Sequence, residues 1–362
     1  MRLPLLSSPQ KKPYFTLVKA PAMKHKTFFW FVLPSALAML LFIFLPMVSI
    51  VVQSLHVSHE QVIIEVENCG PFGCRQSTTV DQEATESLRD AKPLGQFAGL
   101  TTYMDRGHLA VNEVGDAWNA AQGWRDFGGR MLNLPFYKAM AFTLTFTFVV
   151  TPLVIILGFL IAVAVNSATK LIRGQLIFVS LLPMMITPLV GALILFWMVD
   201  ARGIVGAFLQ DISGDPNLSI KASTPLMWIM LMVYGVWHSA PFAFIVYYAG
   251  LQTVNTETLE SAMIDGASRA QRIRYVVLPH LLPLTTFIAL MQLMDNFRVF
   301  EPIISFSASA HATSLSWAIF NDLGGETRQL SSAAATSVLT VIGVIILLTP
   351  VLIRTWRDFG RK

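Results

Sequence analysis

Six long apolar stretches decide what this chain can fold into. They cover roughly residues 28–53, 138–165, 176–199, 226–252, 281–306 and 331–353. A helix needs about 20 consecutive apolar residues to cross the hydrocarbon core of a bilayer, and each stretch reaches that length. Hydrophobic residues make up 54% of the chain and charged residues only 13%, a balance typical of integral membrane proteins. The sequence therefore predicts an all-α, polytopic membrane protein with six transmembrane helices.

Basic residues gather on one side of the expected spans. Six lysines and arginines and no acid lie in residues 1–27, Lys170 and Arg173 follow the second span, and four more lie in the tail. By the positive-inside rule these segments, and so both termini, are expected in the cytoplasm. The first stretch runs past 20 residues with no small-x-small cleavage motif after it, so we expect an uncleaved helix. The expected location is a bacterial inner (plasma) membrane.

This orientation divides the chain into five parts. They are a cytoplasmic segment 1–27, a first transmembrane helix 28–53, a small extracytoplasmic loop domain 54–135, a five-helix core 136–353 and a basic cytoplasmic tail 354–362. The loop domain carries eleven acids against six lysines and arginines. Within it, QVIIEVE has the composition of a strand, whereas DQEATESLRDAK reads as a short polar helix.

The two cysteines of the chain lie close together in the loop domain. Cys69 and Cys74 flank Gly-Pro-Phe-Gly in the stretch NCGPFGC, and these four residues favour a turn that brings the cysteines together. The outer face of an inner membrane permits disulfides, so we expect this pair to form one. Two free thiols are the alternative, and two cysteines without a histidine cluster make a poor zinc site.

Catalytic motifs are missing from the sequence. It contains no G-x-x-x-x-G-K-[ST] phosphate loop, no G-x-S-x-G and no H-E-x-x-H. We therefore expect no enzymatic activity and no metal or cofactor bound by this chain. The net charge of +4 arises from the basic cytoplasmic segments and is not read as a sign of nucleic-acid binding.

A polar segment interrupts the apolar spans at residues 253–280, which the orientation places in the cytoplasm. Asn255 or Thr256 can cap a helix there, and Glu257 and Glu260 fall in its first turn, where carboxylates favour the positive end of the helix. An apolar stripe of mostly small side chains recurs at steps of three and four residues: Leu259, Ala262, Met263, Ala267 and Ala270. Small residues allow another surface to come close.

The rest of this segment predicts a turn and a second helix. Gly266 is expected either to end the first helix, with a positive φ angle, or to admit a neighbouring backbone. Pro279 and Pro283 permit a new helix to start at the membrane edge. The expected arrangement is helix, turn, helix, held outside the bilayer.

The stretch GLQTVNTETLESAMIDGASRAQRIRYVVLPHLLP resembles the cytoplasmic signature of binding-protein-dependent ABC importer permeases, which is Glu-Ala-Ala, then Asp-Gly-Ala, then Leu-Pro. Ser261 replaces the first alanine, and Ile273 stands where an aromatic residue is common. The flanking stretches GVWHSAPFAFIVYYAGLQ and MDNFRVFEPI are similar to the carbohydrate (maltose-type) permeases of that superfamily, so the resemblance covers about residues 136–360. One departure is SASAHATSLSWAIF, which replaces the Gly-Gly-Pro turn that many of those permeases carry.

The resemblance implies a transport subunit and its partners. In such permeases the loop helix docks in a groove of a separate ATPase, so the expected coupling residues are Glu257, Glu260, Ala262, Met263, Asp265, Gly266 and Ala267. Two ATPase subunits would use ATP and Mg, and an extracytoplasmic solute-binding protein would deliver a sugar, oligosaccharide or related polyol. A second permease, usually a different chain, would complete the pathway through the membrane lipid; a homodimer is the alternative.

Charged residues fall within the fifth apolar stretch, where an unpaired charge costs several kcal/mol. Asp295, Arg298 and Glu301 follow one another at steps of three residues, so a chain of ion pairs could satisfy all three without a ligand. Asn296 points to another face and could offer its amide to hydroxyl groups. We therefore expect Asn296 on the substrate path, with Asp295 beside it, and mainly structural roles for the charges.

The fourth stretch contains aromatic and polar residues beside a proline. Tyr234, Trp237 and His238 cluster near Pro241, which bends a helix and frees a backbone carbonyl. Aromatic rings next to polar groups suit the apolar faces and hydroxyls of sugars, so we place these three side chains on the substrate path. A histidine in a span is more often a hydrogen-bonding group between helices, and we favour that role for His238.

Two other classes of function are weighed against the permease. A proton-coupled secondary transporter could use Asp295, Arg298 and Glu301 as its relay, but the spans show no inverted halves and the signature loop has no role there. A receptor or scaffold would need no polar residues in the fourth and fifth stretches.

Overall fold

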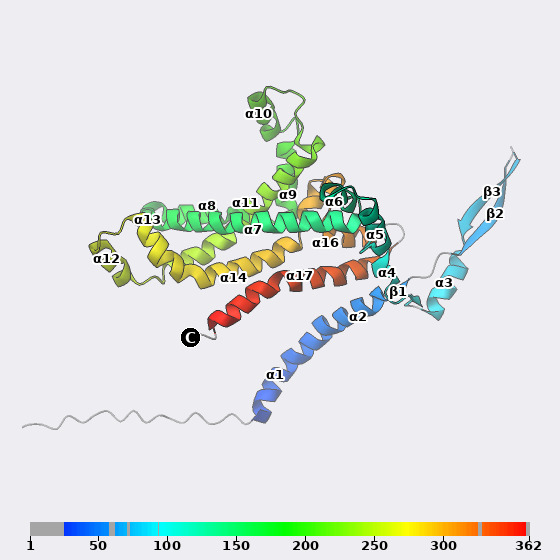
Figure 1. Ribbon diagram of the computed structural model, residues 1–362, viewed down its shortest axis with the longest axis horizontal. Coiled ribbons are helices and arrows are strands. Elements are labelled where there is room, and N and C mark those ends of the chain that lie inside the picture. The colour runs from blue at the N-terminus through cyan, green and yellow to red at the C-terminus, as the bar shows by residue number, and fades with distance from the viewer. Residues whose placement is uncertain (1–24, 58–61, 71–72, 93, 325–327, 360–362) are drawn as a thin grey trace, which may run out of the picture. The chain divides into compact units, whose positions relative to one another are not determined.

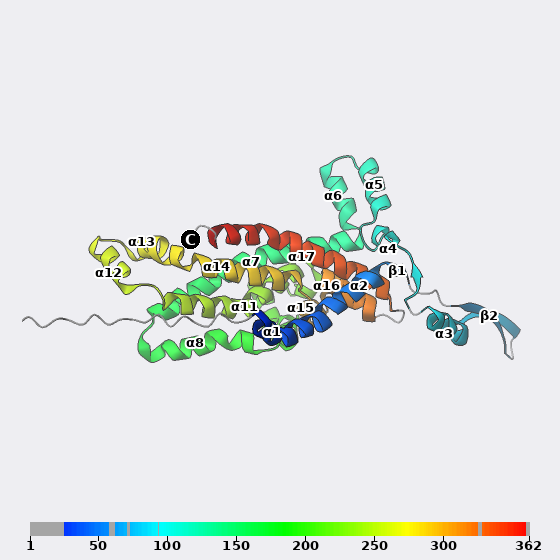
Figure 2. The same ribbon diagram turned by 90° about the horizontal axis from the view of Figure 1, so that it is seen from below.

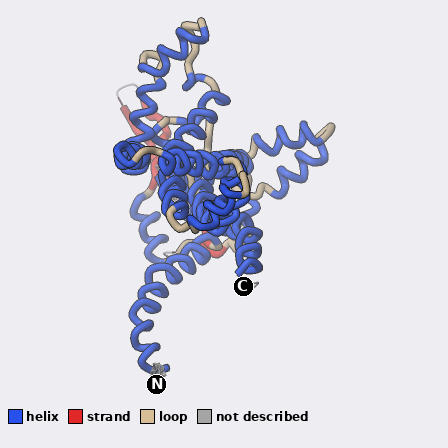
Figure 3. Tube along the Cα trace, turned by 90° about the vertical axis from the view of Figure 1, so that its left-hand side faces the viewer, coloured by secondary structure: helices blue, strands red, loops and turns tan. Residues whose placement is uncertain are grey.

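The computed structural model describes residues 25–57, 62–70, 73–92, 94–324 and 328–359 (Figure 1). Most of the expected cytoplasmic segment 1–27 and the last three residues of the tail lie outside these ranges. The chain separates into two units, residues 1–49 and 50–362, which are taken one at a time. The chain is mainly helical, and strands form a small part of it (Figure 3).

The first unit is dominated by an apolar helix that continues into the second unit. It comprises α1 (His25–Met39), a π-helical segment (Leu40–Phe44) and α2 (Leu45–Ser54). The π turn lies just before Pro46, whose ring would clash with a carbonyl of the preceding turn in a regular α-helix. The wider turn lets the helix pass the proline, and residues 28–54 form one candidate membrane span.

The loop that follows contains both helices and strands. It holds β1 (His56–Val57), β2 (Ile63–Gly70), β3 (Gly73–Val80), α3 (Gln82–Ala91), β4 (Gln96–Phe97), α4 (Thr101–Met104), α5 (Val111–Ala120) and α6 (Trp124–Leu132). β1 pairs with β4 and β2 with β3, both antiparallel. The expected strand and polar helix are confirmed as β2 and α3. The strands are confined to this loop, where the β-branched residues of β2 and β3 favour a hairpin, and the rest of the described chain is helical.

The β2–β3 register bears on the cysteine prediction. Cys69 lies directly opposite Cys74 in this ladder, and direct cross-strand partners have Cβ atoms about 4.5–5.5 Å apart. The two side chains lie outside the described part of the structure, so the disulfide stays a prediction.

We expect mass spectrometry of unreduced, alkylated peptides to show Cys69 and Cys74 joined. The closed loop is short, so the bond should stabilise the hairpin only toward the low end of about 2–4 kcal/mol. A sample reduced before alkylation is the control. Two alkylated thiols in the unreduced sample would show the pair to be free.

The remaining chain forms a helical bundle. Its elements are α7 (Pro135–Ser167), α8 (Lys170–Met185), α9 (Pro188–Val199), α10 (Ile204–Ser213), α11 (Thr224–Leu251), α12 (Thr256–Ile264), α13 (Arg269–Arg272), α14 (Leu278–Phe297), α15 (Glu301–Ser305), α16 (Leu315–Gly324) and α17 (Leu330–Phe359). Helices α7, α11 and α14 pack against one another along their lengths (Figures 1 and 2). Their shared core includes Phe142, Phe146, Phe244 and Ile288.

A glycine lets α7 and α11 come close. A Cβ atom at Gly158 of α7 would lie 2.5 Å from Ala243 Cβ and 2.9 Å from Phe244 N of α11. Small residues at such crossings bring helix backbones together where no hydrophobic effect drives association. This contact makes α7 and α11 one tightly packed pair.

Within the described residues, five helices are long and apolar enough to span a membrane: 28–54, 135–167, 224–251, 269–297 and 330–357. The third expected span is instead a pair, α8 and α9, bent by 94°. Counting that pair as one span gives six. A continuous helix over 176–199 was therefore wrong, because Thr187 is extended before Pro188, as residues before proline prefer, and the proline starts a new helix.

The fifth expected span is displaced from the predicted 281–306. α14 begins at Leu278 with Pro279 in its first turn, as the prolines predict, but the helical path starts earlier, at Arg269, and reaches α14 through a π-helical segment (Ile273–Val277). The π turn again stands just before a proline, Pro279. At the other end α14 stops at Phe297, and Pro302, which has no N–H to donate, lies in the separate helix α15.

Candidate functional site

Three side chains from distant parts of the chain form hydrogen bonds with backbone carbonyls at the break between α8 and α9. Tyr234 Oη of α11 donates to Pro188 O at 2.6 Å, and Ser305 Oγ of α15 donates to Leu189 O at 3.0 Å. His238 Nε2 lies 3.2 Å from Ile186 O, and because a carbonyl only accepts, this nitrogen carries the proton. These bonds tie α11 and α15 to the bend, and the one from His238 supplies a partner to Ile186 O, which lies between the two helices.

A cavity of about 620 Å³ lies beside this bend. Four of the five side chains expected on the substrate path line it: Tyr234, His238, Asp295 and Asn296. Trp237 does not line the cavity, although its ring lies 6.1 Å from that of Tyr234. The cavity therefore combines aromatic and polar groups, as expected, with Trp237 outside it.

The charged residues of the cavity differ from the expected ion-pair chain. Arg298 donates to Asp295 at 3.0 Å, but both side chains are more than half exposed, so this bridge contributes little stability. Within the described residues no basic side chain pairs with Glu301. The predicted Arg298–Glu301 pair is wrong because the helix ends at Phe297, so the three-residue spacing no longer places these side chains on one helical face.

Asn296 has a structural contact that the sequence did not reveal. Its side chain is only 5% exposed, and Nδ2 donates to Thr151 Oγ1 of α7 at 3.0 Å. Asn296 therefore ties α14 to α7 while it also borders the cavity. The amide of Asn296 is thus mostly buried, whereas the Asp295–Arg298 pair is more than half exposed, and all three residues line the cavity.

Helix α16 forms a wall of the cavity that sequence reasoning missed. Ser316, Ile319, Phe320 and Leu323 line the cavity from this helix, at spacings of three, one and three residues. Serine and glycine are frequent in residues 307–330, a composition that favours a loop. The i, i+3, i+4, i+7 recurrence of these four residues was the signal that could have revealed the helix.

The cytoplasmic-loop prediction agrees closely with the structure at the first helix. α12 begins at Thr256, and Asn255 Oδ1 accepts a hydrogen bond from Glu257 N at 2.8 Å. At its other end Ala267 N donates to Ala262 O and Gly266 N to Met263 O, the two bonds of a Schellman motif. Gly266 has φ +77°, so the positive φ is confirmed, and no neighbouring atom of this chain comes within 4 Å of a Cβ placed there.

The second helix of the loop starts with its own cap. Ser268 Oγ accepts from Gln271 N, and Gln271 Oε1 accepts from Ser268 N at 2.7 Å, which together form a capping box. At the base of the loop, His280 Nε2 lies 3.0 Å from Thr253 Oγ1. This contact joins the residues just after α11 to the first turns of α14.

The loop presents a different apolar surface from the predicted stripe. Leu259 packs against the core of the bundle, and Ala262 and Ala267 are half-buried. Met263 is 56% exposed and Ile264, which sequence reasoning did not select, is 87% exposed. The acids Glu257, Glu260 and Asp265 are exposed around them. The outward face is thus two large apolar side chains within an acidic rim.

Several transport permeases are similar in sequence to part of this chain. It is 28% identical over 228 residues to the probable ABC transporter permease protein y4oQ of Sinorhizobium fredii, an alignment that covers 61% of this chain and 72% of the relative. It is 28% identical over 223 residues to the trehalose/maltose transport system permease protein MalF of Thermococcus litoralis, covering 58% and 71%. With the sn-glycerol-3-phosphate permease UgpA of Escherichia coli it shares 28% over 184 residues, covering 49% and 61%.

A solved structure shares the fold. The bacterial alginate ABC transporter in complex with an alginate pentasaccharide-bound periplasmic protein contains a chain that matches with a TM-score of 0.61 and 17% identity, covering 90% of this chain and 92% of that one. Residues 154–356, more than half of the 362, match the family described as "Binding-protein-dependent transport system inner membrane component". The chain therefore belongs to this family of multi-pass inner membrane proteins.

Proposed function

We propose that this chain is the transmembrane permease subunit of an ABC importer, that it forms half of the pathway for an uncharged sugar, oligosaccharide or related polyol, and that separate ATPases dock on α12. The observation that carries the proposal is the loop 253–280: a doubly capped helix–turn–helix that displays Met263 and Ile264 within an acidic rim. An ordinary connector has no need of two apolar side chains held outward.

The cavity supports a carbohydrate cargo. Aromatic side chains such as Tyr234 and Phe300 stand beside hydrogen-bonding groups such as Ser239 and Ser316. The relatives' names include trehalose/maltose and glycerol-3-phosphate, and the structural neighbour transports alginate. Because Arg298 neutralises Asp295 while Glu301 has no partner among the described residues, the cavity carries a net negative charge, which favours an uncharged cargo over a phosphate or uronate.

The topology completes the proposal. Both termini and the loop 253–280 lie in the cytoplasm, and the loop 54–135 lies outside, where it meets the solute-binding protein. A second permease, different from this chain or identical to it, lies across the pathway. The proton-coupled alternative is disfavoured, since its relay would need Arg298 and Glu301 in contact.

Copurification and transport together test the function. Purification of the complex through a tag on this chain should recover an ATPase, and uptake of labelled trehalose or maltose should survive a protonophore while ATP is maintained. Substituting Met263 and Ile264 with serine should remove the ATPase from the complex, because it removes the apolar centre of the proposed interface. Uptake that collapses with the proton gradient at constant ATP would refute the proposal.

Removal of residues 62–92 should lower the stimulation of ATPase activity by loaded binding protein, while the ATPase still copurifies with this chain. This deletion takes out β2, β3 and α3, while His56 and Val57 remain paired with Phe97 and Gln96, so a short glycine linker can close the gap. We expect the ATPase to copurify normally and its stimulation by loaded binding protein to fall severalfold. The full-length chain with the same linker inserted after Lys92 is the control. Unchanged stimulation would show that this part of the loop has no role in docking.

A further inference from the structure

The α5–α6 hairpin carries an apolar stripe on each helix, and Val111, Trp118 and Trp124 of these stripes are exposed. Val111, Val114 and Trp118 on α5, and Trp124, Phe127 and Met131 on α6, recur at the same spacing of three and four residues. The Trp118 ring packs edge-on against Trp124 at 5.4 Å and Phe127 at 5.2 Å. Even so, Trp118 is 55% exposed and Trp124 78% exposed. An apolar face this rich in tryptophan marks a binding surface.

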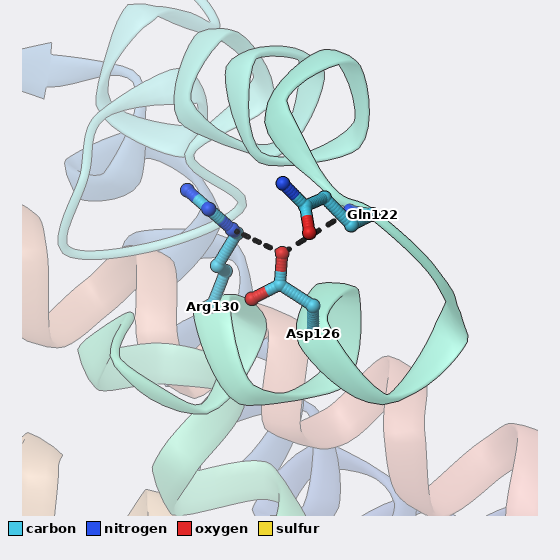
Figure 4. A network of polar contacts seen from close by, with 3 residues as sticks. All are labelled: Gln122, Asp126 and Arg130. Atoms are coloured by element: carbon cyan, nitrogen blue, oxygen red, sulfur yellow. Dashed lines mark hydrogen bonds and ion pairs between the residues drawn. The ribbon is translucent and has the colours of Figure 1, made fainter.

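The turn between the two helices is fixed by one carboxylate. Asp126 Oδ2 accepts from Gln122 N at 3.2 Å and from Arg130 Nε at 3.1 Å (Figure 4). These two contacts, the backbone bond first, hold the pKa of Asp126 below its usual range, so the carboxylate is ionised at neutral pH. The hairpin is therefore a preformed element and not a loose loop.

The base of the hairpin is anchored to the bundle. Tyr137 Oη of α7 donates to Leu109 O at 2.9 Å, and His108 Nε2 donates to Ser332 O of α17 at 3.1 Å. The hairpin runs across the direction of α7 (Figure 2). Because α7 crosses the membrane, helices that run across it lie along the membrane surface.

The position of the hairpin relative to the bilayer follows from the length of α7 and from the short connection between α6 and α7. Only two residues separate Leu132, the end of α6, from Pro135, the start of α7, so the two helix ends are three Cα–Cα steps apart and lie within about 11 Å of each other. The 33 residues of α7 span about 50 Å, compared with about 40–45 Å for a bilayer including its headgroups. The hairpin therefore lies at the level of the outer headgroups.

We propose that the α5–α6 hairpin is an interfacial anchor whose tryptophan face inserts into the headgroup region of the outer leaflet. Tryptophan favours this region because it combines a large apolar ring with one N–H donor. The stripe contains no charged residue, whereas Asp116, on the opposite side of α5, is exposed to water. The lipid surface is the occupant that an apolar face meets at the level of the headgroups. The inference depends on the membrane topology and not on the cargo.

The depth of two nitroxide labels tests the anchor. The complete transporter is reconstituted in nanodiscs of phosphatidylcholine and phosphatidylglycerol, with Cys69 and Cys74 replaced by serine and one label at Trp124→Cys. The matched control carries its label at Asp116→Cys. By power saturation, we expect the label at 124 to collide more often with oxygen and the label at 116 with a water-soluble nickel chelate. Equal access of the chelate to both labels would overturn the proposal.

Two further measurements keep the test decisive. If Trp124→Cys lowers expression, Val111→Cys places the label on the same stripe and leaves the three aromatic rings in place. The labels are also measured with loaded binding protein added. If the chelate reaches position 124 freely in the nanodisc alone and is excluded only when the binding protein is present, the face binds protein and the lipid proposal is wrong.

Discussion

Gly266→Val should fold and insert normally but lose most of its transport. The φ angle of +77° costs an L-residue about 1–2 kcal/mol and a β-branched residue more, so the Schellman turn should open and release the end of α12. Since 1.4 kcal/mol corresponds to a factor of ten, we expect transport and ATPase stimulation to fall at least about tenfold. Uptake assays, with membrane abundance measured in parallel, check this result.

Two control variants separate backbone strain from contact with the ATPase. Gly266→Asn tolerates the left-handed conformation and should keep much of the activity, whereas Gly266→Ala should fall between the two. In this chain a Cβ at position 266 meets nothing, so an asparagine variant as inactive as valine would place an ATPase backbone against the glycine. A valine variant that transports at the normal rate would reduce the loop to a simple connector.

Tyr234→Phe should destabilise the protein by about 1 kcal/mol, because it removes the hydrogen bond that ties α11 to the first turn of α9. Adding Ser305→Ala, which removes the bond from α15 to Leu189 O, should enlarge the loss. The thermal midpoint of the purified complex measures this effect. Tyr248→Phe is the matched control. Tyr248 lies on the same helix as Tyr234, and its hydroxyl has no hydrogen-bond partner among the described residues.

The comparison of Tyr234→Phe with wild type also separates two roles for this hydroxyl. A lower midpoint with proportionally lower abundance assigns the hydroxyl to holding the bend between α8 and α9. If the midpoint stays unchanged and uptake of the cargo is lost, the hydroxyl binds cargo and its bond to Pro188 is incidental.

The features that the sequence predicts well depend on neighbouring residues. Asn255 caps the helix two residues ahead of it, and Gly266 ends that helix through its own φ angle, so both could be read from a short stretch. Five of the six spans follow from long runs of apolar residues, for which the bilayer leaves helix as the main solution.

The features that sequence reasoning missed depend on residues far apart. The bonds that Tyr234, His238 and Ser305 make to carbonyls at the bend come from residues 46 to 116 positions away. Asn296 lines the cavity and also donates to Thr151, 145 residues away, a contact that no local pattern reveals. Which side of α12 turns outward was decided by the packing of Leu259 against the bundle, and no periodicity reveals that.

The contact between Thr253 and His280 has a mechanical consequence. This hydrogen bond joins the two chain segments that flank α12 and α13. Leu259 of α12 packs against the core of the bundle. We therefore expect a partner that binds at Ile264 to move α11 and α14 together and not one without the other. Since α11 is closely packed on α7 at Gly158, and residues of α7, α11 and α14 line the cavity, we expect such a movement to change the shape of the cavity.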